Sequence, residues 1–194
     1  MAILRKKGLS FRRRKKKASL SISKNIALFI VKILITLFIA FIVVYTVGMK
    51  VTVSGNSMES TVSDSDRVLV NRLIYSLSDP KSGDVIVFLP NGNEKSHYYV
   101  KRVVAVPGDT VLIRDGVLYI NGAMYDEEDT EAIVSAGLAE EEITVGDDEY
   151  FVLGDNRNSS EDSRYANIGN VKKEYIVGKA WFYFGSIRNM GRIQ

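Results

Sequence analysis

The most apolar part of the chain is one continuous stretch near its beginning. Ile26–Val47 contains a single charged residue, Lys32. In a helix these residues would rise about 33 Å at about 1.5 Å each, which is enough to cross the hydrocarbon core of a bilayer. Lys32 lies near one end, where its aliphatic stem lets the ammonium reach the headgroups. The pattern predicts a transmembrane anchor over residues 25–48.

The rest of the chain has the pattern of short β-strands. Turn-forming residues separate runs rich in Val, Ile, Tyr and Phe, and the pairs Asp115-Gly116 and Asn121-Gly122 are typical of tight hairpin turns. Such close spacing favours an antiparallel sheet over β-α-β units. The predicted fold is mainly β, an antiparallel coiled-sheet or partial-barrel domain behind one N-terminal transmembrane helix. The predicted strands are Arg67–Leu73, Asp84–Leu89, Tyr98–Val106, Thr110–Ile113, Val117–Ile120, Tyr150–Leu153 and Ile176–Phe184.

The composition changes between residues 125 and 149, where acidic residues are frequent and apolar residues are few. Within this segment, Thr130–Glu140 has a composition that allows one helix. We expect residues 125–149 to form a small acidic excursion from the sheet.

Charge is distributed unevenly along the chain. Residues 1–24 contain ten Lys or Arg and no acidic residue, whereas residues 33–194 contain 15 basic and 23 acidic residues, a net charge of −8. Lys and Arg are enriched on the cytoplasmic side of membrane helices. We therefore expect a single-pass protein of the cell membrane, with residues 1–24 as a cytoplasmic tail and residues 49–194 as an extracytoplasmic catalytic domain.

Two other interpretations of the N-terminal part remain open. A cleaved signal peptide usually has an apolar core of about 7–15 residues, so the longer stretch here favours an uncleaved anchor. A basic tail can also bind nucleic acid, but this one has no interleaved aromatic residues and no folded module beside it. We expect the lipid bilayer, and no nucleic acid, to be a partner.

The chain has few residues that bind metals. Cysteine is absent, which excludes disulfides, thiolate catalysis and Cys-ligated metals, and His97 is the only histidine. In a strand, the four residues from His97 to Lys101 would separate the two by about 13 Å. We expect His97 to be a surface residue after a turn, and we expect no metal and no cofactor.

Three segments contain residues with catalytic potential. In the first, VSGNSMEST, Gly55 gives the backbone freedom before Ser57, and the large apolar Met58 follows. Serines near glycine are common in turns, so this segment alone does not identify a nucleophile.

In the second segment, YYVKRVVAVPGD, Lys101 interrupts an apolar strand. A lysine in a strand can be a solvated residue that protects a sheet edge. If Lys101 instead faces an apolar pocket, burial lowers its pKa from about 10.4. The neutral amine could then act as general base for a serine hydroxyl.

The third segment, GDNRNSSEDSRY over Gly154–Tyr165, is dense in turn-forming and charged residues. One interpretation is a solvated loop whose Asp162–Arg164 surface pair has little energetic value. The other is a supporting loop, in which serines orient the base and the ion pair stiffens the backbone.

Together, these segments resemble bacterial type I signal peptidases, the membrane-anchored serine proteases that remove signal peptides with a Ser-Lys dyad. SGNSMEST resembles the nucleophile box, RVLVNR the next strand, YVKRVVAVPGD the lysine box and GDNRNSSEDSR the last box, all in the family's order. The resemblance covers nearly the whole chain, including the anchor.

The resemblance implies a role for each matching residue. Ser57 would be the nucleophile and Lys101 the general base. The substrates would be secretory preproteins with small residues at the first and third positions before the cut, bound in extended form beside a strand. The other matches would be Ser160, which hydrogen-bonds the lysine amine, the Asp162–Arg164 ion pair, Gly154 and Asp155 at the floor, and Gly55 and Met58 on the substrate and oxyanion side.

The sequence departs from the family in three places. Ser60 replaces the usual proline two residues after the methionine. Because a proline would fix φ near −65°, the turn with serine should be looser, while its type and direction need not change. Gly55 stands where some members have a serine that helps hold the oxyanion, which leaves the Ser57 N–H as the expected donor. After Arg164 the chain reads YANIGNV and lacks the tryptophan-glycine of relatives.

Two other functions remain open. The chain could be a dedicated processing peptidase for a narrow client such as a pilin or a surface-fibre subunit. It could also be a noncatalytic, membrane-anchored assembly factor on the same fold, although the presence of both Ser57 and Lys101 argues against that.

Overall fold

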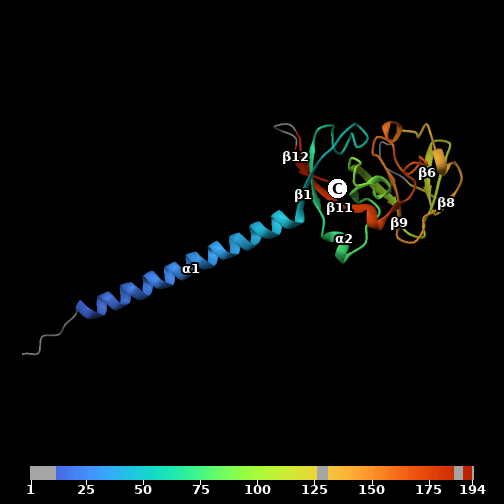
Figure 1. The fold of residues 1–194 in the computed structure, drawn as a ribbon. Helices are drawn as coiled ribbons and strands as arrows, with labels where there is room; N and C mark the ends of the chain where they lie inside the picture. Colours follow the sequence, from blue (N-terminus) through green and yellow to red (C-terminus); the bar gives the residue numbers. More distant parts are fainter. Residues whose placement is uncertain (1–11, 126–130, 186–189, 194) are drawn as a thin grey trace, which may run out of the picture. The chain divides into compact units, whose positions relative to one another are not determined.

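The computed structural model describes residues 12–125, 131–185 and 190–193. The chain divides into two compact units, residues 1–46 and residues 47–194. The described part of the first unit is one long helix, α1 (Arg12–Val47), and the second unit contains the β-strands (Figure 1).

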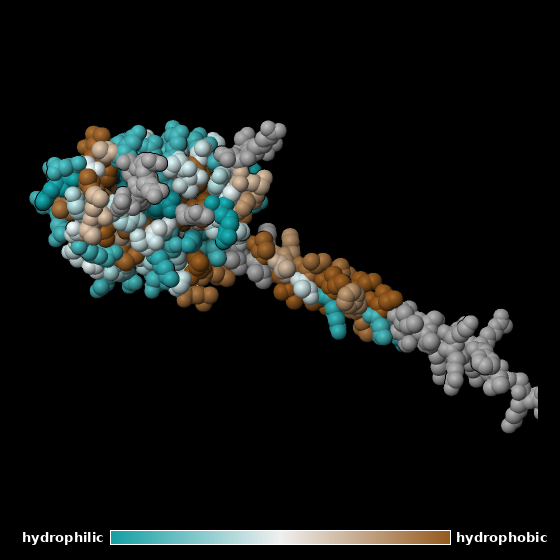
Figure 2. Space-filling model, turned by 180° about the vertical axis from the view of Figure 1, so that it is seen from behind, coloured by the Kyte–Doolittle hydropathy of each residue, from teal (hydrophilic) through white to brown (hydrophobic). Residues whose placement is uncertain are grey.

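Helix α1 carries the predicted apolar stretch. Within it, Lys24–Ile42 has a mean hydropathy of 2.6 and is long and apolar enough to cross a membrane. The apolar side chains of this window are exposed, and Figure 2 shows their hydrophobic surface along the helix. A helix with apolar side chains around its whole circumference is stable in lipid, so α1 fits a single-pass membrane anchor.

The second unit is built on an eight-stranded antiparallel sheet. Its strands follow the order β1-β2-β11-β3-β4-β9-β10, and β12 pairs with β11. Register shifts in β4 and β11 mark irregularities that bend the sheet into a curled half-barrel. The strands are β1 (Gly48–Thr52), β2 (Arg67–Asn71), β3 (Val85–Phe88), β4 (Tyr99–Ala105), β9 (Glu149–Leu153), β10 (Val171–Lys172), β11 (Ile176–Phe184) and β12 (Met190–Arg192).

A second, four-stranded sheet has the order β7-β6-β5-β8. Its two tight turns are those that the sequence predicts, since Asp115 and Asn121 have φ near 52° and the glycine after each also has positive φ. Both residues of such a turn need positive φ, which Asn, Asp and Gly adopt most readily. The strands are β5 (Thr110–Arg114), β6 (Val117–Ile120), β7 (Ala123–Met124) and β8 (Ile143–Thr144).

The predicted mainly antiparallel β fold is confirmed, and each predicted strand overlaps an observed one. The short strands β1, β7, β8, β10 and β12 were not predicted. Short helices connect the strands: α2 (Ile74–Leu77) and the 3₁₀ turns η1 (Pro90–Gly92), η2 (Gly137–Glu140), η3 (Arg157–Ser159) and η4 (Lys173–Tyr175).

The predicted helix over 130–140 is wrong for residues 131–140, where the only helical element is the 3₁₀ turn η2. Residue 130 lies outside the described residues. Distant groups bind this backbone instead: Ile133 N–H donates to Gly116 O, and Leu138 N–H donates to Arg164 O. Gly137 has φ of 56°, outside the right-handed helical region. Long-range pairing therefore overrides the local helical composition.

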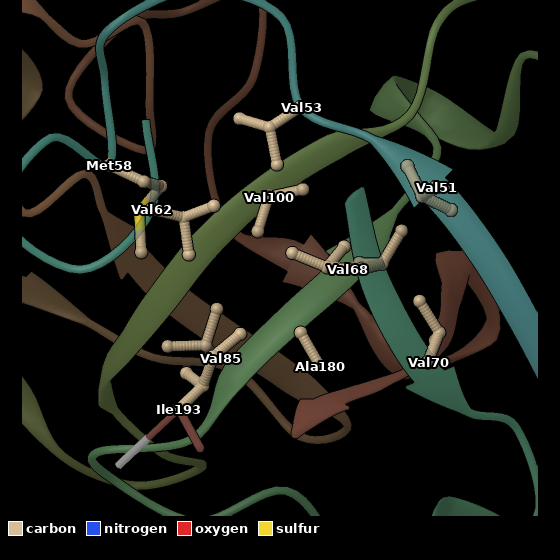
Figure 3. Packing of buried hydrophobic residues seen from close by; sticks show 11 residues of the cluster. Val51, Val53, Met58, Val62, Val68, Val70, Val85, Val100, Ala180 and Ile193 are labelled. Carbon is tan, nitrogen blue, oxygen red and sulfur yellow. The ribbon is translucent and has the colours of Figure 1, made fainter. Parts of the chain in front are cut away.

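One core cluster lies directly beneath the candidate nucleophile segment. Met58 from this segment and Val62, which follows it, pack with Val68, Val85 and Val100 from the sheet (Figure 3). Met58 is fully buried. Burying an apolar side chain of this size contributes about 1.5–3 kcal/mol, so the cluster holds the loop on the sheet.

Candidate active site

Ser57 lies in the loop that connects β1 to β2. The loop closes at its base, where Val53 N–H donates to Asp66 O and Ser65 N–H donates to Val53 O. Inside the loop, Val62 N–H donates to Met58 O. The buried Met58 side chain and these hydrogen bonds fix the backbone on both sides of Ser57.

Lys101 lies on an interior strand, because β4 pairs with β3 on one side and with β9 on the other. Its residue surface is only 4% exposed, so the alternative of a solvated edge lysine is wrong. Lys101 Nζ donates a hydrogen bond to Ser57 Oγ at 2.6 Å. The structure thus brings together two residues that are far apart in the sequence.

Burial lowers the pKa of Lys101 from 10.5 to about 8. The carboxylates of Asp162, Glu161 and Asp155 act against this shift, and the Arg164 guanidinium acts with it. A lysine with this pKa is partly neutral near pH 8 and has a lone pair that can accept a proton. The site therefore has the two elements of nucleophilic catalysis, a hydroxyl and a base in contact with it.

Asp162 and Arg164 form a buried ion pair, with Arg164 Nε 2.8 Å from Asp162 Oδ1. Gly154 N–H donates to Asp162 Oδ2, and the Arg164 guanidinium also donates to the backbone carbonyls of Arg157 and Ser135. The solvated-loop interpretation of this segment is therefore wrong. The pair binds the start and the end of the 154–164 loop to each other.

Ser160 Oγ is buried but forms no hydrogen bond with any described residue, so the predicted bond to Lys101 is absent from the structure. Its hydroxyl lies against Gly154 instead. A Cβ at position 154 would collide with Ser160 Oγ and with the Ser57 carbonyl oxygen. Gly154 therefore permits the close approach of the β1–β2 loop, which contains Ser57, and the 154–164 loop.

Ser57 and Lys101 line a groove of about 460 Å³. Three chain segments line it, residues 53–57, residues 97–101, and Ser159 with Glu161. His97 is exposed in this lining, as predicted for a surface histidine. A larger cavity of about 700 Å³ beside Arg72 and Tyr75 contains none of the predicted site residues, so the smaller groove is the candidate site.

Gly55 and Met58 have different positions relative to the groove. Gly55 lines it, and its N–H donates to Asp64 Oδ1 at 2.6 Å, which occupies that donor. Met58 lies in the core beneath and is fully buried. Met58 therefore supports the loop from below.

Comparison with known proteins identifies the family. The family described as signal peptidase, peptidase S26, matches residues 26–184. This chain belongs to the S26 signal peptidase family. The predicted resemblance is thereby confirmed.

Relatives within this family are bacterial signal peptidases I. The chain is 37% identical to the probable signal peptidase I-2 of Synechocystis sp. over 72% of this chain and 64% of that protein. It is 37% identical to signal peptidase I P of Bacillus subtilis subsp. natto over 79% of this chain and 86% of that one. A crystal structure of signal peptidase I from Enterococcus faecalis V583 is 33% identical and covers 53% of this chain and 97% of that chain, with a TM-score of 0.43.

The backbone of Ser60 has a conformation that the sequence analysis did not predict. Its φ is 113°, whereas proline is fixed near −65°. The expectation that the turn keeps its type and direction is therefore wrong. A proline at this position requires a different backbone path after the methionine.

Arg102 and Thr61 form a polar cluster with Asp155 that the sequence analysis did not predict. Arg102 binds Asp155 through two hydrogen bonds of 2.8 and 2.9 Å, and both side chains contact Thr61 Oγ1. This cluster joins the β1–β2 loop, strand β4 and the 154–164 loop. The available sequence signal was the position of Arg102, directly after Lys101 on the opposite face of the strand.

Proposed function

We propose that this chain is a serine endopeptidase that removes N-terminal signal peptides from exported preproteins, with Ser57 as nucleophile and neutral Lys101 as general base. Removal of signal peptides by a serine peptidase follows from the family to which the chain belongs. One observation carries the assignment of the two residues: a buried lysine amine lies 2.6 Å from a serine hydroxyl, and both residues line a groove.

The chemistry is acyl transfer in two steps. Neutral Lys101 takes the Ser57 proton while Oγ attacks the scissile carbonyl, and the Ser57 N–H stabilises the oxyanion. The protonated lysine then gives its proton to the leaving amine, which releases the mature protein. Water deacylates the signal peptide from Ser57 by the same proton transfers, and the amine returns to its neutral form.

The groove suits an extended peptide. Residues 53–57 and residues 97–101 both line the groove, and we propose that a peptide pairs with the backbone of these segments by strand addition. In this pose, alternate side chains of the peptide point toward the enzyme. We propose that they are the residues at the first and third positions before the cut, and that small side chains fit best there.

The remaining matches have supporting roles in this proposal. The Asp162–Arg164 pair holds the 154–164 loop, and Gly154 lets that loop approach Ser57. Asp155 binds Arg102 and so connects the loop to the lysine strand. Ser160 lies in the same crowded region, with its hydroxyl against Gly154.

We propose that α1 anchors the protein in the cell membrane, with residues 1–24 in the cytoplasm and residues 49–194 outside. The basic N-terminal segment and the positive-inside bias support this orientation. Preproteins emerging from the membrane would then meet the catalytic domain on the outer side.

The test is cleavage of a secretory preprotein by the full chain in detergent micelles, with sequencing of the new N-terminus. We expect a cut after a small-x-small site that disappears in Ser57→Ala and in Lys101→Ala. Lys81→Ala, at an exposed lysine, is the matched control. Cleavage that survives Lys101→Ala would overturn the base assignment, and a folded chain that cuts no preprotein would favour the noncatalytic alternative.

A further inference from the structure

Glu161 is a carboxylate in the groove that the proposed chemistry does not use. It is exposed, whereas its neighbours Ser160 and Asp162 are buried. It lines the same groove as Ser57 and Lys101. A charged side chain in this position faces the space that a bound peptide occupies.

Two neutral donors hold the Glu161 carboxylate in place. Tyr99 Oη donates to Glu161 Oε2 at 2.8 Å, and Asn167 Nδ2 donates to Glu161 Oε1 at 2.5 Å. These hydrogen bonds, that from Asn167 first, lower the pKa of Glu161, so the group is ionised at neutral pH. Each carboxylate oxygen accepts about two hydrogen bonds, which leaves acceptor capacity for a ligand.

The carboxylate lies close to the reacting groups. Tyr99 is two residues before Lys101 on β4, and Lys101 Nζ is 5.7 Å from the centre of the Tyr99 ring. The Tyr99 side chain thus connects the lysine to Glu161. A peptide whose scissile bond is at Ser57 therefore passes a fixed negative charge in the same groove.

We propose that Glu161 determines a charge preference of the substrate groove, which favours cationic side chains and disfavours carboxylates at positions adjacent to the cut. This inference rests on the proposed function, because it needs a peptide in the groove. It adds a charge criterion to the small residues expected at the first and third positions.

The expected effect is moderate because Glu161 is exposed to solvent. An interaction between two exposed charges changes a binding constant by up to about fivefold. Glu161 attracts a lysine in the substrate and repels an aspartate. Both effects raise kcat/KM for a lysine peptide relative to the matching aspartate peptide, so we expect a Lys-to-Asp ratio of about ten.

The test uses fluorogenic peptides with alanine at the first and third positions before the cut. Lysine, glutamine or aspartate is placed in turn at the second position before the cut and at the two positions after it. For each position, kcat/KM is measured with the full chain in detergent, and the Lys-to-Asp ratio is compared among wild type, Glu161→Gln, Glu161→Lys and the exposed control Glu142→Gln.

At one position or more, we expect a Lys-to-Asp ratio of about ten for wild type and for Glu142→Gln. The ratio should fall to near two in Glu161→Gln and below one in Glu161→Lys, which would prefer the aspartate peptide. A ratio near one in wild type, or the same ratio in Glu161→Gln, would overturn the proposal. An equal fall in Glu142→Gln would also overturn it, since the net charge of the domain would then be the cause. Failure of wild type to cut the glutamine peptides would instead count against the proposed function.

Discussion

Replacing Lys101 by methionine should make the folded protein more stable at neutral pH. The folded pKa of Lys101 is about 8, compared with 10.5 for an unburied lysine. A difference of about 2.5 pKa units, at about 1.4 kcal/mol each, corresponds to about 3 kcal/mol. Methionine has a similar length and no charge, so Lys101→Met removes this penalty and loses one hydrogen bond of about 1 kcal/mol to Ser57.

The sign of the pH dependence follows from proton binding. Between about pH 8 and pH 10.5, the unfolded lysine keeps a proton that the folded lysine has lost, so wild-type stability rises with pH across this window. Below about pH 8 both states are protonated and the full burial penalty applies. Lys101→Met should therefore exceed wild type by about 2 kcal/mol at pH 7 and fall slightly below it near pH 10.5.

The assay is urea unfolding of the full chain in detergent micelles, followed by the fluorescence of Trp181, the only tryptophan. Trp181 lies in β11 of the large sheet and reports on its unfolding. Titration of groups that do not interact with Lys101 is common to both proteins and cancels in the difference. Lys81→Met controls for loss of an exposed charge. A difference between variant and wild type that does not change with pH would refute the burial argument.

Three further predictions concern the loops that carry the site. Ser60→Gly should raise the free energy of unfolding by about 1 kcal/mol and Ser60→Pro should lower it, because φ at this position is 113°; equal stability of both variants would contradict this. Gly154→Ala should reduce kcat/KM at least about tenfold, since its Cβ collides with the Ser57 carbonyl oxygen. Gly146→Ala meets only the flexible carboxylate of Glu149 and should cleave like wild type. A double-mutant cycle of Arg102→Met and Asp155→Asn should give a coupling energy of about 2 kcal/mol in urea unfolding. If the two effects on the free energy of unfolding simply add, the pair does not couple β4 to the 154–164 loop.

The features that the sequence predicted well depend on local patterns. Strand periodicity and the Asp115-Gly116 and Asn121-Gly122 pairs require only neighbouring residues, and the observed strands and turns agree with them. The long apolar stretch likewise identified α1 as a span candidate without tertiary information. Motif resemblance brought Ser57 and Lys101 to attention, but the sequence could not show that Lys101 is buried.

The features that the sequence missed depend on contacts between distant segments. The segment around Ile133 forms no α-helix because its Ile133 N–H donates a hydrogen bond to the carbonyl oxygen of Gly116, in a different part of the chain. Ser60, which lies between the buried Met58 and Val62, has a positive φ for which the sequence has no local signal. Thr61 and Arg102 meet Asp155 only in the folded chain, so their shared cluster was not visible in the motifs.

The central claim is that Lys101 acts as a neutral base toward Ser57, and the pH profile of kcat/KM tests it most directly. With a neutral fluorogenic peptide and the full chain in detergent, we expect kcat/KM to rise between pH 6 and pH 10 through a single ionisation with an apparent pKa of about 8. A profile that is flat over this range, or that rises only near the pKa of a solvated lysine, about 10.4, would contradict the account.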